Sequence, residues 1–285
     1  MAAKFKGFRL WLLGIIALLS FQTCVAPAAD GAGNYDAFVR QLLETGLKSN
    51  AAYALLSKLV VQAPHRLSGS PGERKAIELT MKMMDSIGFQ EVHAESVMVP
   101  HWVRGHRETA VILQGGKQGE RAVAVCALGG SVATPRHGIT AEVLEVHSFE
   151  ELAQLHDAAK GKIVFFNRPM DPAKLHTFGA YGGAVDQRSG GAVRAAEAGG
   201  VAALVRSVTL AHDRVPHAGV MGYKEGVVEI PAAAISTNDA DTLSRLLKRN
   251  PRLRLRLVLD CRTLPDAPSA NVVGQITGWE KPDEV

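Results

Sequence analysis

Apolar side chains in the first third of the chain recur at helical spacing. Residues 35–48 and 50–62 each place leucines and other apolar residues three or four positions apart, which predicts two helices. A third helix is predicted after the sequence Ser-Pro-Gly-Glu at 70–73, because Ser is a favourable N-cap, Pro suits the first helical position and Glu completes a capping box. Gly88 is a favourable residue to end that helix.

Beyond residue 88 the pattern changes to short apolar runs that are typical of strands. The runs 109–113 and 121–128 flank a Gly-rich segment at 115–119, which predicts a hairpin. Further strands are predicted at 97–99, 139–146, 162–166, 201–205, 232–235, 252–259 and 269–276. Helices are predicted between them at 149–159 behind Ser148, at 188–198, and at 238–248 with Asn238 as the N-cap. Alternating strands and helices indicate an α/β fold.

The predicted strand 252–259 alternates Arg with Leu up to Leu257 and ends in Val258-Leu259. The leucines at 253, 255, 257 and 259 would face a core, and the basic residues would face outward. We interpret the basic face as a solvated one whose charges protect a sheet edge, in preference to an anion site.

Residues 1–28 have the pattern of an export signal. A basic segment precedes an apolar run at 10–21, and Ala-Pro-Ala at 26–28 offers a cleavage site. The run is shorter than the roughly 20 apolar residues of a membrane span. We therefore expect an exported, periplasmic or extracellular protein with no stable membrane span after cleavage; an uncleaved anchor and lipidation at Cys24 are the alternatives.

Charge and cysteine content change the picture little. The signal contributes three basic residues and no acidic ones, so its removal takes the formal net charge from +4 to +1, which argues against a nucleic-acid partner. The mature chain keeps Cys126 and Cys261, both in apolar strand-like runs. This placement favours two buried thiols over a disulfide between them.

Catalytic signatures are not found in the sequence. It contains no His-Glu-x-x-His zinc helix and no Walker loop. The stretch Gly-Gly-Ser-Val-Ala at 129–133 differs from a nucleophile elbow at its last position. His93 and Glu95 would share one face of a strand, but nothing nearby completes a metal site. We predict no catalytic and no metal-ligating residue in this chain.

Four segments carry a family resemblance: His-Arg-Leu-Ser-Gly-Ser-Pro-Gly at 65–72, Val-Pro-His-Trp-Val-Arg-Gly at 99–105, a stretch that begins Arg-Ser-Gly-Gly-Ala and runs through 188–236, and Ser-Ala-Asn-Val-Val-Gly-Gln-Ile at 269–276. In order and spacing they resemble the secreted co-catalytic zinc exopeptidases of the carboxypeptidase Q type. The resemblance covers most of the mature chain.

The resemblance implies an α/β architecture in which an incomplete zinc-exopeptidase α/β domain, made of helices and edge strands, is interrupted by a protease-associated α+β insert. It implies four parts: a signal peptide at 1–28, peptidase-domain residues at 29–136, the insert at 137–265, and the start of the remaining peptidase domain at 266–285.

It further implies that this chain is the N-terminal portion of an exported zinc-dependent amino- or carboxypeptidase. The metal ligands and the catalytic Glu would follow Val285, so two zinc ions are expected for the full-length enzyme, none for this chain, and no activity of this chain alone. The full-length enzyme would act on peptides or dipeptides and would form homodimers. The alternative is a standalone protease-associated module that binds a peptide or a protein partner.

Six residues are candidates for shaping a substrate cleft or for docking the domains to each other. They lie in the resembling segments or in the Gly-rich loops of the expected insert, and they are Arg66, His101, Arg104, Tyr181, His217 and Tyr223. For each of them a purely structural role is the alternative.

Overall fold

The computed structural model describes residues 31–114 and 119–284, so the predicted signal peptide and Cys24 lie outside the described residues. The chain divides into two compact units, residues 1–58 and 59–285. Among the described residues, no helix combines the length and the apolar character that a membrane crossing requires.

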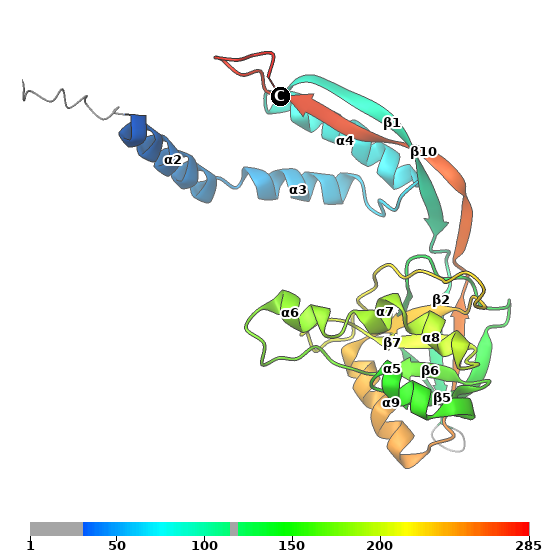
Figure 1. Cartoon of the computed structure of the whole chain (residues 1–285). Coiled ribbons are helices and arrows are strands. Elements are labelled where there is room, and N and C mark those ends of the chain that lie inside the picture. The colour runs from blue at the N-terminus through cyan, green and yellow to red at the C-terminus, as the bar shows by residue number, and fades with distance from the viewer. Residues whose placement is uncertain (1–30, 115–118, 285) are drawn as a thin grey trace, which may run out of the picture. The chain divides into compact units, whose positions relative to one another are not determined.

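The two N-terminal helices are present where the apolar periodicity predicts them. Helix α2 spans Gly31–Lys48 and helix α3 spans Ala51–Gln62 (Figure 1). Side chains 35–48 of α2 are all exposed, including the apolar ones at helical spacing. The apolar periodicity therefore predicts these helices correctly. No packing partner for the apolar side chains of α2 is found among the described residues.

Helix α4, Pro71–Ser86, begins at the predicted capping box. The Ser70 hydroxyl accepts a hydrogen bond from the backbone N–H of Glu73 at 3.1 Å, and the Glu73 carboxylate accepts one from the N–H of Gly69 at 2.6 Å. Gly88 adopts a φ of +96°, the left-handed conformation expected of a residue that follows a helix. The start and the end of this helix are therefore confirmed.

A long antiparallel ribbon follows α4. Its strands are β1, Gln90–Val103, and β10, Arg262–Gln275, and each has 14 residues. The predicted strands at 97–99 and 269–276 are parts of this ribbon. Pro100 does not end β1, because the register shifts between Val99 and His101, the type of irregularity that accommodates a proline.

The ribbon joins the ends of an inserted body that contains an eight-stranded mixed sheet. Its strands are β2 Glu108–Leu113, β3 Glu120–Val123, β4 Val125–Ala127, β5 Ile139–Val146, β6 Ile163–Phe166, β7 Ala202–Arg206, β8 Ala232–Ile235 and β9 Arg254–Leu259. The spatial order is β3-β2-β9-β5-β6-β7-β8-β4. Strands β5 to β8 are mutually parallel, and the other neighbours pair antiparallel.

Helices cover both faces of this sheet. Helices α5 Phe149–Gln154 and α8 Gly191–Glu197 pack on one face, and α9 Thr237–Arg249 packs on the other. The same body also contains a 3-10 turn His156–Ala159 and the helices α6 Thr177–Gly182 and α7 Asp186–Ser189. Alternate residues of β6 face different layers: Ile163 and Phe165 belong to the cluster that includes α9, whereas Val164 and Phe166 belong to the cluster that includes α5 and α8. Coverage of both faces explains why the parallel strands are continuous apolar runs.

Several predicted elements are divided or shifted. The run predicted as one strand at 121–128 forms β3 and β4, which lie at opposite ends of the sheet. Ala124 lies between them and donates its N–H to the Asp239 carboxylate at 2.9 Å, so the chain leaves one ladder and enters another there. Helix α9 is capped by Ser236, whose hydroxyl accepts from the N–H of Asp239, and the prediction of Asn238 as the cap is wrong.

Two predicted helices are interrupted. The helix predicted at 149–159 is α5 followed by the 3-10 turn, and the helix predicted at 188–198 is split into α7 and α8 at Gly190. A Cβ at Gly191 would lie 3.1 Å from the Phe166 ring, so the small residues at this break allow α8 to approach the sheet closely.

Strand β9 has the predicted alternation but not the predicted place. Leu253, Leu255, Leu257 and Leu259 are all buried. The strand pairs with both β2 and β5, so it lies inside the sheet, and the interpretation of its basic residues as protection of a sheet edge is wrong. One of these cations instead forms a cross-strand pair, Arg256 with Glu120 at 3.2 Å.

The eight-stranded sheet also contains strands on both sides of residue 137, where the insert was expected to begin. Strands β2 and β3 precede this position and pair with β9 and with each other, and β4 precedes it and pairs with β8.

Truncation of a buried β9 leucine should destabilise the chain far more than truncation of an outward arginine on the same strand. Leu257→Ala removes a fully buried side chain from the larger core cluster and is expected to lower the free energy of unfolding by about 3 kcal/mol. Arg254→Ala, on the exposed side of the strand, should change it by less than about 0.5 kcal/mol. Urea unfolding measures both, and equal losses would contradict the placement of the core.

Candidate functional site

Arg104 lies at the point where the β1 strand gives way to the inserted body. Its Nη1 donates to the Glu108 carboxylate at 2.9 Å and to the Ala127 carbonyl at 2.7 Å, and lies 2.8 Å from the Cys126 sulfur. Its guanidinium carbon is 5.1 Å from the centre of the Trp102 ring. The same Glu108 oxygen accepts the N–H of Ala127 at 2.8 Å, so one ion pair fixes the start of β2 against β4. Every partner of this guanidinium is internal, which supports a positioning role for Arg104.

A second group of contacts converges on the backbone that follows β4. The Trp102 indole donates to the Ser131 carbonyl at 2.9 Å, and the Cys261 thiol lies 3.1 Å from the same oxygen. The Tyr223 hydroxyl accepts from the N–H of Val132 at 3.0 Å and donates to the Ile230 carbonyl at 2.7 Å. Burial raises the pKa of the Tyr223 phenol above its ordinary value. Both hydrogen-bonding directions of this phenol are therefore used inside the protein.

Arg188 connects Tyr181 with the loop that carries His217. The Arg188 guanidinium donates to the Tyr181 hydroxyl, and its carbon is 5.2 Å from the centre of that ring. A Cβ added at Gly219 would meet the guanidinium at 2.5 Å, so the loop that carries His217 lies directly against Arg188. The backbone N–H of His217 donates to the Ser207 hydroxyl at 2.8 Å. The structure therefore gathers these loops around an arginine that was not among the six candidates.

Arg66 and His101 lie in or beside the loop before α4. The Arg66 guanidinium donates to the Ala63 carbonyl at 2.7 Å, and the residue is otherwise exposed. A Cβ at Gly69 would lie 2.8 Å from the His101 ring and 2.9 Å from Ala267 of β10. His101 therefore packs against the loop, and only glycine at position 69 permits that approach.

A row of polar side chains crosses the carboxyl ends of the parallel strands. The Asn167 amide donates to Glu145 at 2.5 Å and accepts from Arg206 at 3.2 Å. Arg206 also donates to Asp241 at 2.6 Å, and the other Asp241 oxygen lies 2.8 Å from His212. Burial opposes ionisation of Asp241, but its bonds to Arg206 and His212 outweigh that effect and hold its pKa below the ordinary value.

The six sequence candidates do not include this row. A usable signal was nevertheless present, because Asn167 and Arg206 directly follow the predicted strands 162–166 and 201–205. The carboxyl ends of adjacent parallel strands meet at one edge of a sheet, where ligand sites of α/β proteins commonly form. Each charge in the row already has a partner within the chain, so its organisation is that of a structural network.

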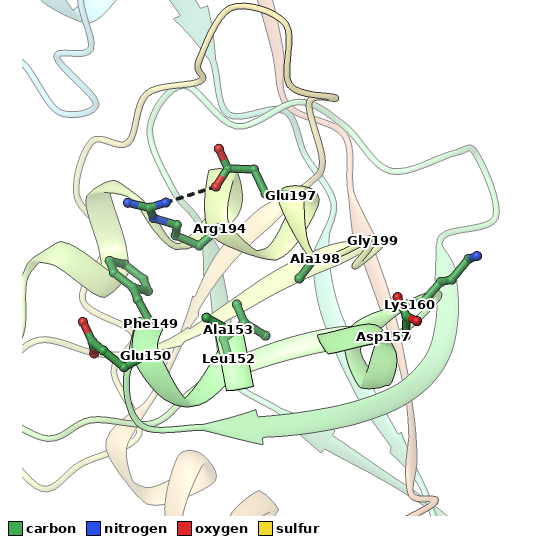
Figure 2. A pocket seen from close by; sticks show the side chains of 10 residues that line it. All are labelled: Phe149, Glu150, Leu152, Ala153, Asp157, Lys160, Arg194, Glu197, Ala198 and Gly199. Carbon is green, nitrogen blue, oxygen red and sulfur yellow. Dashed lines mark hydrogen bonds and ion pairs between the residues drawn. The ribbon is translucent and has the colours of Figure 1, made fainter. Parts of the chain in front are cut away.

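A groove of about 750 Å³ opens between α5 and α8 (Figure 2). Its apolar part comprises Phe149, Leu152 and Ala153 of α5 together with Ala198. Its charges are partly paired: Arg194 lies 3.2 Å from Glu197, and Lys224 bonds the other oxygen of Glu197 at 3.1 Å, which holds the pKa of that carboxyl below its ordinary value. The described residues that line the groove include neither a nucleophile–base pair nor a metal-donor set.

The described residues offer no donor set for a two-zinc centre. Within residues 31–114 and 119–284, no three His, Cys, Asp or Glu side chains come together in a group that would hold a metal ion. His93 and Glu95, which share a strand face as predicted, approach to 3.6 Å with no third donor beside them.

Comparison with known proteins shows which proteins this chain is similar to. Carboxypeptidase Q from Bos taurus is 40% identical over 240 residues, which are 84% of this chain and 48% of the bovine protein. The chain resembles carboxypeptidase Q. No protein-family model matches it. The chain spans about half the length of the curated carboxypeptidase Q relatives that it matches.

Solved structures agree with the likeness to carboxypeptidase Q. A peptidase M28 precursor from Shewanella amazonensis superposes with a TM-score of 0.78 and 34% identity, covering 85% of this chain and 54% of that one. A zinc aminopeptidase from Bacillus subtilis gives a TM-score of 0.51 at 20% identity, covering 81% of this chain and 47% of that one, which shows a shared fold alone. The mixed α/β architecture thus fits an α/β peptidase fold.

Removal of the Glu108 carboxylate should destabilise this carboxypeptidase Q-like chain, because Arg104 and the Ala127 N–H would both lose their shared acceptor. We expect Glu108→Ala to lower the free energy of unfolding by about 2 kcal/mol. Glu120→Ala removes a carboxylate from an exposed ion pair and should cost less than about 1 kcal/mol. Denaturant unfolding of both variants provides the measurement, and similar losses would show that the Arg104 contacts stabilise no more than a surface pair.

Both thiols should react slowly with alkylating reagents in the folded chain. Cys126 and Cys261 are free in the structure, and burial raises the pKa of each above that of an ordinary thiol. A raised pKa leaves less thiolate at neutral pH, so labelling should be slow near pH 7 and accelerate as the pH rises beyond about 8.5. Peptide-resolved mass spectrometry after iodoacetamide treatment measures each site, with urea-unfolded chain as the control. Equal folded and unfolded rates would contradict this protection.

Proposed function

We propose that this chain is the N-terminal portion of an exported zinc-dependent exopeptidase that hydrolyses peptides or dipeptides, and that it provides scaffold while residues following Val285 in the full-length enzyme supply the metal ligands. The observation that carries the proposal is the 40% identity to carboxypeptidase Q over 84% of the chain. Export is supported by the signal pattern at 1–28.

The inserted body is proposed to be the protease-associated domain, with limits near 104–261 in place of 137–265. Val103 pairs with Arg262, so the chain enters and leaves the body at adjacent points of one ribbon. All eight strands of the sheet lie between these two residues. A domain beginning at residue 137 would leave β2 without its partner β9, and β4 without its partner β8.

A standalone peptide- or partner-binding module is the second candidate function. It is favoured by the self-contained character of the inserted body, whose sheet is covered on both faces and has its own core clusters. Such a module would bind without hydrolysing, so activity of a completed enzyme separates the two functions.

The test is a chimera. In it, this chain is followed by the part of the Shewanella amazonensis peptidase that lies beyond the position aligned with Val285. We expect the chimera to hydrolyse dipeptides in a zinc-dependent way and to lose activity with a chelator, because the scaffold and the metal ligands are then together. The unmodified chain and the appended half alone, each assayed with added zinc, serve as controls and should be inactive.

Two results would contradict the proposal. A folded, zinc-loaded chimera without exopeptidase activity would remove the peptidase assignment in favour of the binding module. Chelator-sensitive hydrolysis by the unmodified chain would show that its own residues hold the metal.

A further inference from the structure

Basic side chains gather where helix α9 ends and strand β9 begins. The last two residues of the helix are Lys248 and Arg249, and the strand begins at Arg254. Two further arginines lie on the last turns of the helix and in the connecting turn, and all of these side chains are exposed. We call this group the basic end of the inserted body, and its members are Arg245, Lys248, Arg249, Arg252 and Arg254.

The turn between α9 and β9 holds these cations at fixed points. The N–H of Arg252 donates to the side-chain oxygen of Asn250 at 3.1 Å, and the N–H of Asn250 donates to the Leu246 carbonyl at 2.9 Å. Leu253 is buried, so Arg252 and Arg254 on either side of it face outward. Because the backbone of the turn is already ordered by hydrogen bonds, a ligand that binds there has little ordering cost to offset.

The basic end keeps its positive charge. No carboxylate within the described part of the chain lies at ion-pair distance from any of its members. Glu142 is the cross-strand neighbour of Arg254, but it pairs with Lys162 at 3.4 Å. Glu120 of β3 pairs with Arg256 at 3.2 Å. Neighbouring cations that no carboxylate compensates create a positive potential, which favours an anionic partner.

The surroundings of the basic end distinguish among polyanions. Residues 237–259 contain no aromatic side chain, so nothing in this segment can stack on a nucleic-acid base. The structure describes all of these residues, and no large apolar side chain among them is exposed for insertion into a bilayer. All members of the basic end except Lys248 are arginines, whose guanidinium groups match the paired oxygens of carboxylates and of tetrahedral oxyanions.

We propose that the basic end binds an acidic polysaccharide, that is, a linear glycan that carries sulfate or carboxylate groups. A linear polyanion presents charges along its length, so one glycan chain can contact the end of α9 and the start of β9 at the same time. An encounter with extracellular glycans rests on the export that we propose for this chain. Binding itself requires neither zinc nor peptidase activity.

The test is calorimetric titration of the purified chain with a heparin oligosaccharide. We expect binding that weakens steeply as the salt concentration rises from about 50 to 200 mM, because counter-ions are released when cations neutralise a polyanion. Arg249→Gln combined with Arg252→Gln removes two charges from the basic end and should weaken binding about tenfold. The thermal midpoint of this double variant should not change, since both side chains are exposed.

The matched control is Arg136→Gln combined with Arg262→Gln. Both of these arginines are exposed, and they lie near the opposite end of β9: Arg136 precedes β5, whose first residue pairs with Leu257, and Arg262 follows β9 along the chain. The control changes the net charge by the same amount and should bind heparin as the parent chain does.

The proposal is overturned if the oligosaccharide does not bind, or if the control weakens binding as much as the double variant of the basic end. Equal or tighter binding of phosphatidylglycerol vesicles or of single-stranded DNA would also overturn it, in favour of a membrane surface or a nucleic acid. If the double variant does not fold, phenylglyoxal modification of the parent chain decides. Heparin should then protect Arg249 and Arg252 in peptide-resolved mass spectrometry, and unchanged modification would contradict the proposal. Because no hydrolysis is measured, failure here and failure of the chimera to hydrolyse dipeptides are separate results.

Discussion

The pairing of β1 with β10 is the constraint on which the rest of the molecule depends. It brings Val103 beside Arg262 and thereby closes a long excursion of the chain into a separate body. Closing a long loop costs entropy that grows only slowly with its length, so a few well-made contacts at the closure offset much of that cost. The Arg104–Glu108 pair and the Trp102 hydrogen bond to Ser131 lie at this closure, which explains their internal hydrogen bonds.

The pairing of β1 with β10 also separates the inserted body from the ribbon. Inside the body, parallel strands covered on both faces form a core against which Trp102 of the ribbon also packs. Its loops at the carboxyl ends of those strands are held by polar contacts such as Asn167 with Arg206 and His217 with Ser207. Rigid strands with polar loops at one edge are the usual setting for a ligand site in an α/β fold.

Most of the helices and strands were predictable from local sequence patterns. Such patterns, for example capping and alternation, depend on residues that are close together along the chain. The capping box at 70–73 and the alternation at 253–259 each correspond to what the structure contains. Pairing of distant strands was not predictable in this way. The alternation of β9 shows that one face is buried, but it is the same for an edge strand and for an interior one, so the place of β9 between β2 and β5 required the structure.

The site residues illustrate the same limit. Tyr181 and His217 were identified from their Gly-rich loops, but the residue that connects these loops, Arg188, looks in sequence like any basic residue near a helix. Three features that are distant from it in the sequence define the environment of Arg188. They are the Tyr181 ring from α6, Gly219, whose lack of a side chain leaves room for the guanidinium, and the absence of a carboxylate partner within the described residues. Arg206 lies 2.6 Å from Asp241, whereas no carboxylate lies at ion-pair distance from Arg188 among the described residues, and the sequence alone does not distinguish these two environments.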